Sequence, residues 1–171
     1  PILLDAELEQ LRQVHSTILK AHTLDTTWPV SEGTAGLDAA LERLCREADA
    51  VLAVGVNILI LSDRAVGPDR APVPALLAVA AVHHHLVREG TRLQAGLVVE
   101  TGDAREVHHF CVLAGYGAEA INPYLAFETL FAMKRDLAKE VDDEELVHRY
   151  IKSLDKGLLK VMSKMGISTY Q

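Results

Sequence analysis

The chain of 171 residues is long enough for one domain with a complete hydrophobic core. Lys and Arg number 17 against 24 Asp and Glu, a formal charge of −7 without any basic stripe, which argues against a nucleic-acid or anionic-membrane partner. The apolar runs are far shorter than the roughly 20 residues that cross a bilayer, so the sequence predicts no helical membrane span.

Apolar periodicity predicts strands that alternate with amphipathic helices. A weak strand over 18–24 runs into an Asp-Thr-Thr-Trp-Pro turn at 25–29, and a helix follows over 36–54. The next strand, 56–61, is almost continuously apolar, as a parallel strand covered on both faces should be. The remaining predicted elements, in chain order, are a helix over 75–88, a strand over 96–99, a helix over 104–114, a strand over 118–121, helices over 125–139 and 142–164, and a strand that starts at 166–169.

This alternation predicts an α/β fold whose parallel sheet is built of βα units. We expect a partial (β/α) TIM-like barrel, with an open flavodoxin-like sheet as the alternative. A partial barrel has exposed sheet edges, so we also expect the chain to self-associate or to cover its edge. The chain starts at Pro1 without Met and ends directly after an apolar stretch, so both ends are expected to be cut from a longer polypeptide.

Polar residues stand where four of the predicted strands end. They are Asp25, Asp63, Glu100 and Asn122. In parallel α/β folds this edge is where sites form, so these four are candidate site residues of a self-standing (β/α) enzyme or binding domain. Asp, Ser and Asn at such positions also cap the following helix and anchor loops, and we favour this structural interpretation.

Histidine and cysteine patterns predict no metal site. Residues 83–85 are three consecutive histidines, and a helix turns about 100° per residue, so they cannot converge on one ion. Cys45 and Cys111 lie outside any metal-ligand spacing and are expected to be buried, reduced thiols. The Gly-Tyr-Gly at 115–117 follows a helix and precedes a strand, the reverse of a dinucleotide fingerprint, so it predicts a tight turn. No catalytic residue is predicted.

Several long stretches resemble the large subunit of glutamate synthase. They are 25–29 (DTTWP), 57–64 (NILILSDR), 72–86 (PVPALLAVAAVHHHL), 96–100 (GLVVE), 105–110 (REVHHF), 115–126 (GYGAEAINPYLA) and 156–169 (KGLLKVMSKMGIST). These stretches follow one another in one order over nearly the whole chain, which is far more specific than any short motif. The resemblance implies the later part of the central domain over 1–140 and the start of the FMN-binding synthase domain over 141–171, in one compact unit.

For the parent enzyme, the resemblance implies reductive transfer of the glutamine amide nitrogen to 2-oxoglutarate, which yields two glutamates. It implies FMN and an iron–sulfur cluster in the parent and neither in this stretch, with Ser168 and Gln171 as the residues nearest to FMN or substrate. This stretch would be a non-catalytic scaffold that links the glutaminase and synthase sites and lines an ammonia tunnel. Its partners would be the remaining domains of the large subunit, with a small subunit or ferredoxin for the parent. The expected compartment is the cytoplasm, or the plastid in a photosynthetic eukaryote.

Overall fold

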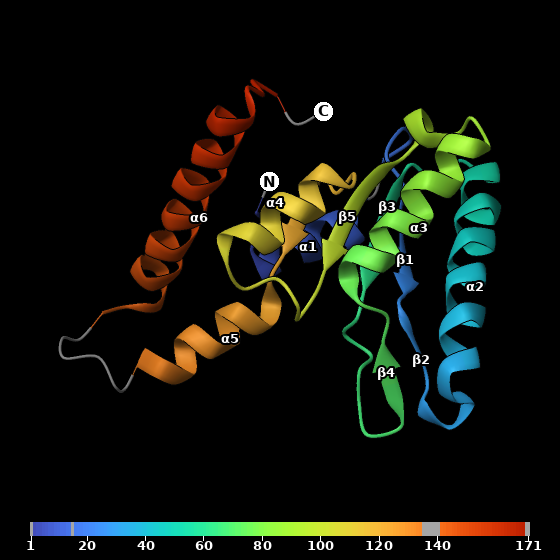
Figure 1. Cartoon of the computed structure of the whole chain (residues 1–171), viewed down its shortest axis with the longest axis horizontal. Coiled ribbons are helices and arrows are strands. Elements are labelled where there is room, and N and C mark those ends of the chain that lie inside the picture. Colours follow the sequence, from blue (N-terminus) through green and yellow to red (C-terminus); the bar gives the residue numbers. More distant parts are fainter. Residues whose placement is uncertain (1, 15, 135–140, 170–171) are drawn as a thin grey trace.

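The computed structural model of the protein describes residues 2–14, 16–134 and 141–169. Its centre is a four-stranded sheet with the spatial order β1-β3-β5-β6 (Figure 1). The strands are β1 (Ala21–Asp25), β3 (Ile58–Ser62), β5 (Gly96–Glu100) and β6 (Ala120–Asn122). Neighbouring strands pair in parallel throughout this sheet, so the predicted α/β class with a parallel sheet of βα units is confirmed.

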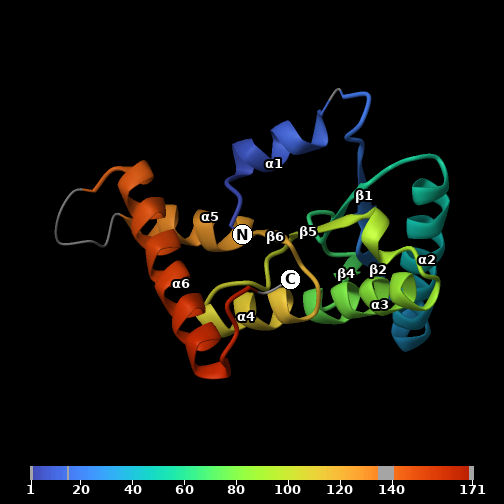
Figure 2. The same ribbon diagram turned by 90° about the horizontal axis from the view of Figure 1, so that it is seen from above.

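An α-helix lies in each connection between neighbouring strands. These helices are α2 (Gly33–Ala53), α3 (Ala75–Arg88) and α4 (Val107–Gly115), and they lie on the same face of the sheet (Figure 2). Right-handed crossovers between strands that are added in one direction fall on one side. This order is consistent with a partial (β/α) barrel, whereas a flavodoxin-like sheet needs a reversal of strand order that the described strands do not contain.

The main hydrophobic core lies between the sheet and these three helices. α2 contributes a stripe of buried residues that recur every four positions: Gly36, Ala40, Leu44, Ala48 and Leu52. From the sheet, Leu59 and Leu61 of β3 join this core, and each is at most 1% exposed. The predicted strand over 56–61 is therefore confirmed, shifted by one or two residues, and the predicted helix over 75–88 has the same bounds in the structure.

The opposite face of the sheet is covered by α1 (Asp5–Arg12), which the sequence did not predict. α1 is short and mostly polar, and its buried residue is Leu8. Leu8 packs against Ile60 and Val98, which neighbour each other on β3 and β5. Leu3, just before α1, donates its backbone N–H to the carbonyl of Ile121 in β6 (2.9 Å), so the amino-terminal segment also covers the outer edge of the sheet.

Two short strands form an antiparallel ribbon beyond the carboxyl ends of the sheet. β2 (Thr27–Pro29) pairs with β4 (Arg70–Pro72). Both strands end in a proline, which argues against a strand in a sequence pattern, so this ribbon was not predicted. Trp28 of β2 lies against α2 at Gly36, where a Cβ would overlap the indole ring, so glycine is required there. Two 3-10 turns, η1 (Val30–Glu32) and η2 (Arg92–Gln94), precede α2 and β5.

The last two helices are α5 (Tyr124–Met133) and α6 (Asp143–Met165). The predicted strand at 166–169 is wrong, because the described residues there form a bend after Gly166 ends α6 with φ +70°. A strand needs a partner, and the outer edge of β6 already pairs with Ile2. The predicted boundary at 140/141 stays a prediction, and 135–140 lie outside the described residues. Over the described part of the chain, no helix is both long and apolar enough to cross a membrane.

Candidate functional site

The carboxyl ends of the strands bring the four candidate residues to one edge of the sheet. The strand register aligns Asp25 with Ser62, Ser62 with Glu100, and Glu100 with Asn122, and Asp63 follows β3 directly. Asp63, Glu100 and Asn122 are at most 4% exposed, whereas Asp25 is half-buried. Buried polar groups require partners, so the partners decide what this edge can do.

Glu100 is the centre of the largest polar network at this edge. Its carboxylate accepts hydrogen bonds from the guanidinium of Arg12 in α1 and the hydroxyl of Ser62 in β3. Arg64 donates to the second carboxylate oxygen (3.3 Å) and also to Glu128 of α5 (2.8 Å). The buried carboxylate of Glu100 thus connects α1, β3 and β5 directly, and α5 through Arg64. The sequence pattern did not predict this structural role.

Asn122 extends this network to the amino-terminal segment. Its side-chain amide donates to the carbonyl of Leu3 (3.0 Å) and to Asp5 (2.8 Å). Its side-chain oxygen is fully buried and has no hydrogen-bond partner in the described part of the chain. The guanidinium of Arg64 stacks 4.1 Å above the ring of Tyr124, which starts α5. These contacts fix the amino-terminal segment over the end of β6.

Asp63 anchors the loop that follows β5. It accepts hydrogen bonds from the hydroxyl of Thr101 (2.6 Å) and from the backbone N–H of Gly102 (3.0 Å). Burial raises the pKa of Asp63, while the bonds from Thr101, Tyr124 and Gly102 act in the opposite direction. Asp63 is 4% exposed, and these hydrogen bonds occupy its carboxylate within the loop after β5.

Asp25 holds the β2–β4 ribbon against the sheet. It accepts from the backbone N–H and hydroxyl of Thr27 (2.8 and 2.7 Å) and forms an ion pair with Arg70 (2.7 Å). Arg43 of α2 donates to the carbonyls of Asp25 and Thr27. The structure therefore places the four candidates on one edge but divides them between two networks, one under the ribbon and one under α1.

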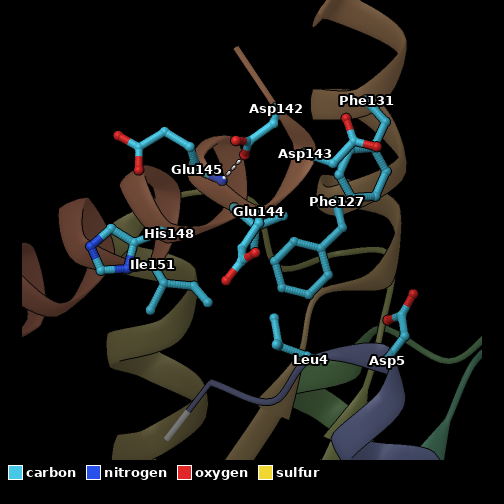
Figure 3. Close-up of a pocket in the computed structure, with 11 residues that line it drawn as sticks. Leu4, Asp5, Phe127, Phe131, Asp142, Asp143, Glu144, Glu145, His148 and Ile151 are labelled. Atoms are coloured by element: carbon cyan, nitrogen blue, oxygen red, sulfur yellow. Dashed lines mark hydrogen bonds between the residues drawn. The ribbon is translucent and has the colours of Figure 1, made fainter.

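A groove of about 750 Å³ lies elsewhere, between α5, α6 and the residues that lead into α1. Figure 3 shows Phe127, Phe131 and Leu4 turned into it, with acidic side chains at its rim. The acids are Asp5, Asp142, Asp143, Glu144 and Glu145. No local pattern in the sequence predicts this groove, because the acids at 142–145 equally fit the N-terminal turn of a helix.

The histidine triplet has separate partners. Nδ1 of His83 accepts from Arg92 (3.0 Å), His85 contacts Asp49 (2.7 Å), and the ring of His84 packs edge-on against Tyr116. Within the described ranges, no three His, Cys, Asp or Glu side chains are grouped so that they could hold a metal ion.

The other residues singled out from the sequence lie apart from both networks. Cys45 of α2 and Cys111 of α4 are half-buried free thiols, and burial raises the pKa of each. Ser168 is exposed in the bend after α6, and Gln171 lies outside the described residues. A role for Ser168 or Gln171 near FMN stays a prediction.

Comparison with known proteins places these observations in a family. A family model described as the glutamate synthase central domain matches residues 1–171. The chain is 45% identical to glutamate synthase [NADH] of Schizosaccharomyces pombe and 41% identical to the glutamate synthase [NADPH] large chain of Bacillus subtilis, with 100% of this chain covered in each case. It is also 41% identical, over 98% of its length, to the chloroplastic ferredoxin-dependent glutamate synthase of Oryza sativa subsp. japonica.

The matched region is a small part of these relatives. The chain spans 8% of the Schizosaccharomyces protein and 11% of the Bacillus and rice proteins. The similarity nevertheless extends over the whole of this chain, as the earlier resemblance implied, and the parallel βα units agree with the fold expected from it. The chain belongs to the glutamate synthase central domain family.

Proposed function

We propose that this chain acts as a non-catalytic scaffold within a glutamate synthase, which transfers the amide nitrogen of glutamine reductively to 2-oxoglutarate and forms two glutamates. The scaffold role is supported by the hydrogen bonds and ion pairs of the polar side chains at the carboxyl edge of the sheet. There, where α/β enzymes place their sites, Asp25, Asp63 and Glu100 are each occupied by neighbouring side chains. A self-standing enzyme would need these groups to face a ligand-sized cavity.

The scaffold links a glutaminase site to a synthase site in the remaining domains of the same longer polypeptide, and part of its surface lines the passage for ammonia. The relatives' names include three electron donors, NADH, NADPH and ferredoxin, yet the chain is about equally similar to all three kinds. This supports donor selection by regions other than this one, including a small subunit or a ferredoxin surface. The compartment would be the cytoplasm, or the plastid in a photosynthetic eukaryote.

FMN and an iron–sulfur cluster supply the electron-transfer chemistry of such an enzyme. The residues described for this chain do not fit an iron–sulfur cluster, because Cys45 and Cys111 lie on different helices, α2 and α4. We therefore assign the cluster and FMN to other domains. Ser168 is the described residue that we propose to approach FMN, with Gln171 beside it in sequence.

The first arm of the test uses the 171-residue chain alone. Incubated with glutamine, 2-oxoglutarate and, in turn, NADH, NADPH or reduced ferredoxin, it should form no glutamate above the rate without protein. Steady turnover by the isolated chain would contradict the scaffold role and favour the self-standing enzyme.

The second arm uses the polypeptide in which this chain is joined to its glutaminase and synthase domains. There, Asp63→Asn and Glu100→Gln should lower the melting temperature but leave kcat per folded molecule within about twofold. A general acid or base at this edge would instead contribute about 10²–10⁴-fold. A loss of that size without a change in folded fraction would assign catalysis to the strand ends.

A further inference from the structure

α1 covers a face of the sheet that is apolar along the strands and polar at their carboxyl ends (Figure 2). Ile60 of β3 and Val98 of β5 pack against Leu8 of α1. Side chains two positions apart in a strand point to the same face, so Ser62 and Glu100 also face α1, and both are at most 5% exposed. An apolar floor that ends in buried polar groups at the carboxyl ends of strands has the composition of a ligand site in an α/β fold.

α1 occupies this surface with one apolar and one charged side chain. Leu8 and Arg12 are four positions apart, so they lie on the same side of the helix. A terminal nitrogen of Arg12 donates to the carboxylate of Glu100, and its Nε donates to the hydroxyl of Thr23 (3.3 Å). Thr23 is the register partner of Ile60, so both acceptors lie on the face that α1 covers. A planar guanidinium group matches two separate acceptors better than an ammonium group, which is a compact point charge.

Leu8 supplies the buried apolar contact of α1. The helix has 8 residues, and residues 16–20 on the way to β1 are exposed. A helix this short is not stable alone in water, so its contacts with the sheet keep it folded. Segments with little buried apolar surface open locally at a lower free energy than global unfolding. Local opening of α1 therefore uncovers Glu100 while the sheet stays folded.

We propose that β1, β3 and β5 form a binding site for a guanidinium compound, which Arg12 occupies from within the chain, with α1 as a cover that opens locally. The site combines the carboxylate of Glu100, the hydroxyl of Thr23 and the apolar surface of Ile60. The side chain of Arg12 is 28% exposed and that of Glu100 is 4% exposed, so the guanidinium group reaches solvent although the carboxylate is buried. The site needs no other domain, so it is independent of the scaffold role.

Arg64 does not fill the position that Arg12 holds. Its Nε donates to the other carboxylate oxygen of Glu100 (3.3 Å), while its Nη1 donates to Glu128 (2.8 Å) and its guanidinium stacks on the ring of Tyr124. Without the side chain of Arg12, the first oxygen of Glu100 keeps the hydrogen bond from the hydroxyl of Ser62. A buried carboxylate that loses a cation is destabilised, so a guanidinium ion from solution should restore part of the lost stability.

Thermal unfolding of Arg12→Ala, followed by circular dichroism, tests the site with methylguanidinium chloride as the probe. At about 20 mM probe, we expect the melting temperature to rise saturably by about 2–4 °C, the shift that a ligand at about five times its dissociation constant produces. Methylammonium chloride and sodium chloride at the same concentration should raise it by less than about 1 °C, because neither cation has a planar fork of donors.

Three control proteins separate this site from general salt effects. The wild type should not shift, because Arg12 fills the site. The double variant Arg12→Ala/Glu100→Gln lacks the carboxylate and should not shift either. Arg149→Ala removes an arginine that pairs with Glu145 at an exposed position, so it loses an ion pair without leaving a buried carboxylate and should not respond to the probe.

Hydrogen exchange of the wild type tests the cover separately. The α1 amides should exchange at rates that low urea concentrations do not change, as local opening predicts, whereas the α2 amides should respond to urea. If Arg12→Ala is largely unfolded, sucrose in all samples raises its folded fraction and the same comparison is made. No saturable rise in folded Arg12→Ala, an equal rise with sodium chloride, an equal rise in the double variant, or equal urea responses of α1 and α2 would each overturn the proposal.

Discussion

Glu100→Gln tests how much the strand-end network stabilises the fold. Glutamine keeps the shape of the side chain but removes the charge that Arg12 and Arg64 share. A charge-assisted hydrogen bond contributes about 1.5–3 kcal/mol when buried. The arginine side chains are 28% and 43% exposed, so water replaces part of each lost interaction. We expect a total loss of about 2–3 kcal/mol in the free energy of unfolding.

Urea unfolding followed by circular dichroism measures this loss, and hydrogen exchange locates it. Glu100 holds the end of α1 through Arg12. The substitution should therefore increase the exchange rates of the α1 amides, compared with wild type, more than it increases those of the α2 amides. Glu9→Gln is the matched control, since Glu9 contacts the same arginine from an exposed position and should cost less than about 0.5 kcal/mol. Equal unfolding free energies for the two variants, or unchanged exchange in α1, would refute the structural role of Glu100.

Three further variants test the core, a turn and a histidine. Ile60→Ala should cost about 2–5 kcal/mol in urea unfolding, because it removes a fully buried side chain between the sheet and α1; a cost of a few tenths would contradict that packing. Gly117→Ala should cost about 2–4 kcal/mol, because φ is +108° and the added Cβ would overlap the ring of His83, and a neutral effect on the melting temperature would count against this turn. Burial lowers the pKa of His83 in the folded state, and the charges of Arg92 and His84 lower it further. The contribution of His83 to the free energy of unfolding is therefore fully present above the unfolded pKa of 6.5. It is lost as the pH falls through the lower folded pKa. His83→Gln should therefore lose less stability than wild type between pH 7 and pH 5, and parallel stability curves would show that His83 is not responsible.

The strand-end residues illustrate how far a local pattern reaches. Asp25, Asp63, Glu100 and Asn122 were predicted to share one edge, and the register places them there. Position alone cannot separate an anchor from a site, because a carboxylate that binds a ligand and one that binds an arginine look alike in sequence. The partners distinguish them, and the groups that bind Glu100 come from α1, β3 and the loop after β3.

The apolar pattern by itself predicted the strands of the parallel sheet and the helices between them, whereas the structure decided the order of the strands in the sheet. A strand buried on both faces is continuously apolar and an amphipathic helix repeats every three to four residues, so both leave a signal within a few neighbouring positions. Only the tertiary structure revealed three features: α1, the β2–β4 ribbon and the groove beside α6. α1 has one buried residue, Leu8. The hydrogen bond that holds α1 to the sheet joins Arg12 to Glu100, 88 positions away in the sequence. A short polar helix is not stable alone, so tertiary contact stabilises it, and such contact leaves no local pattern in the chain.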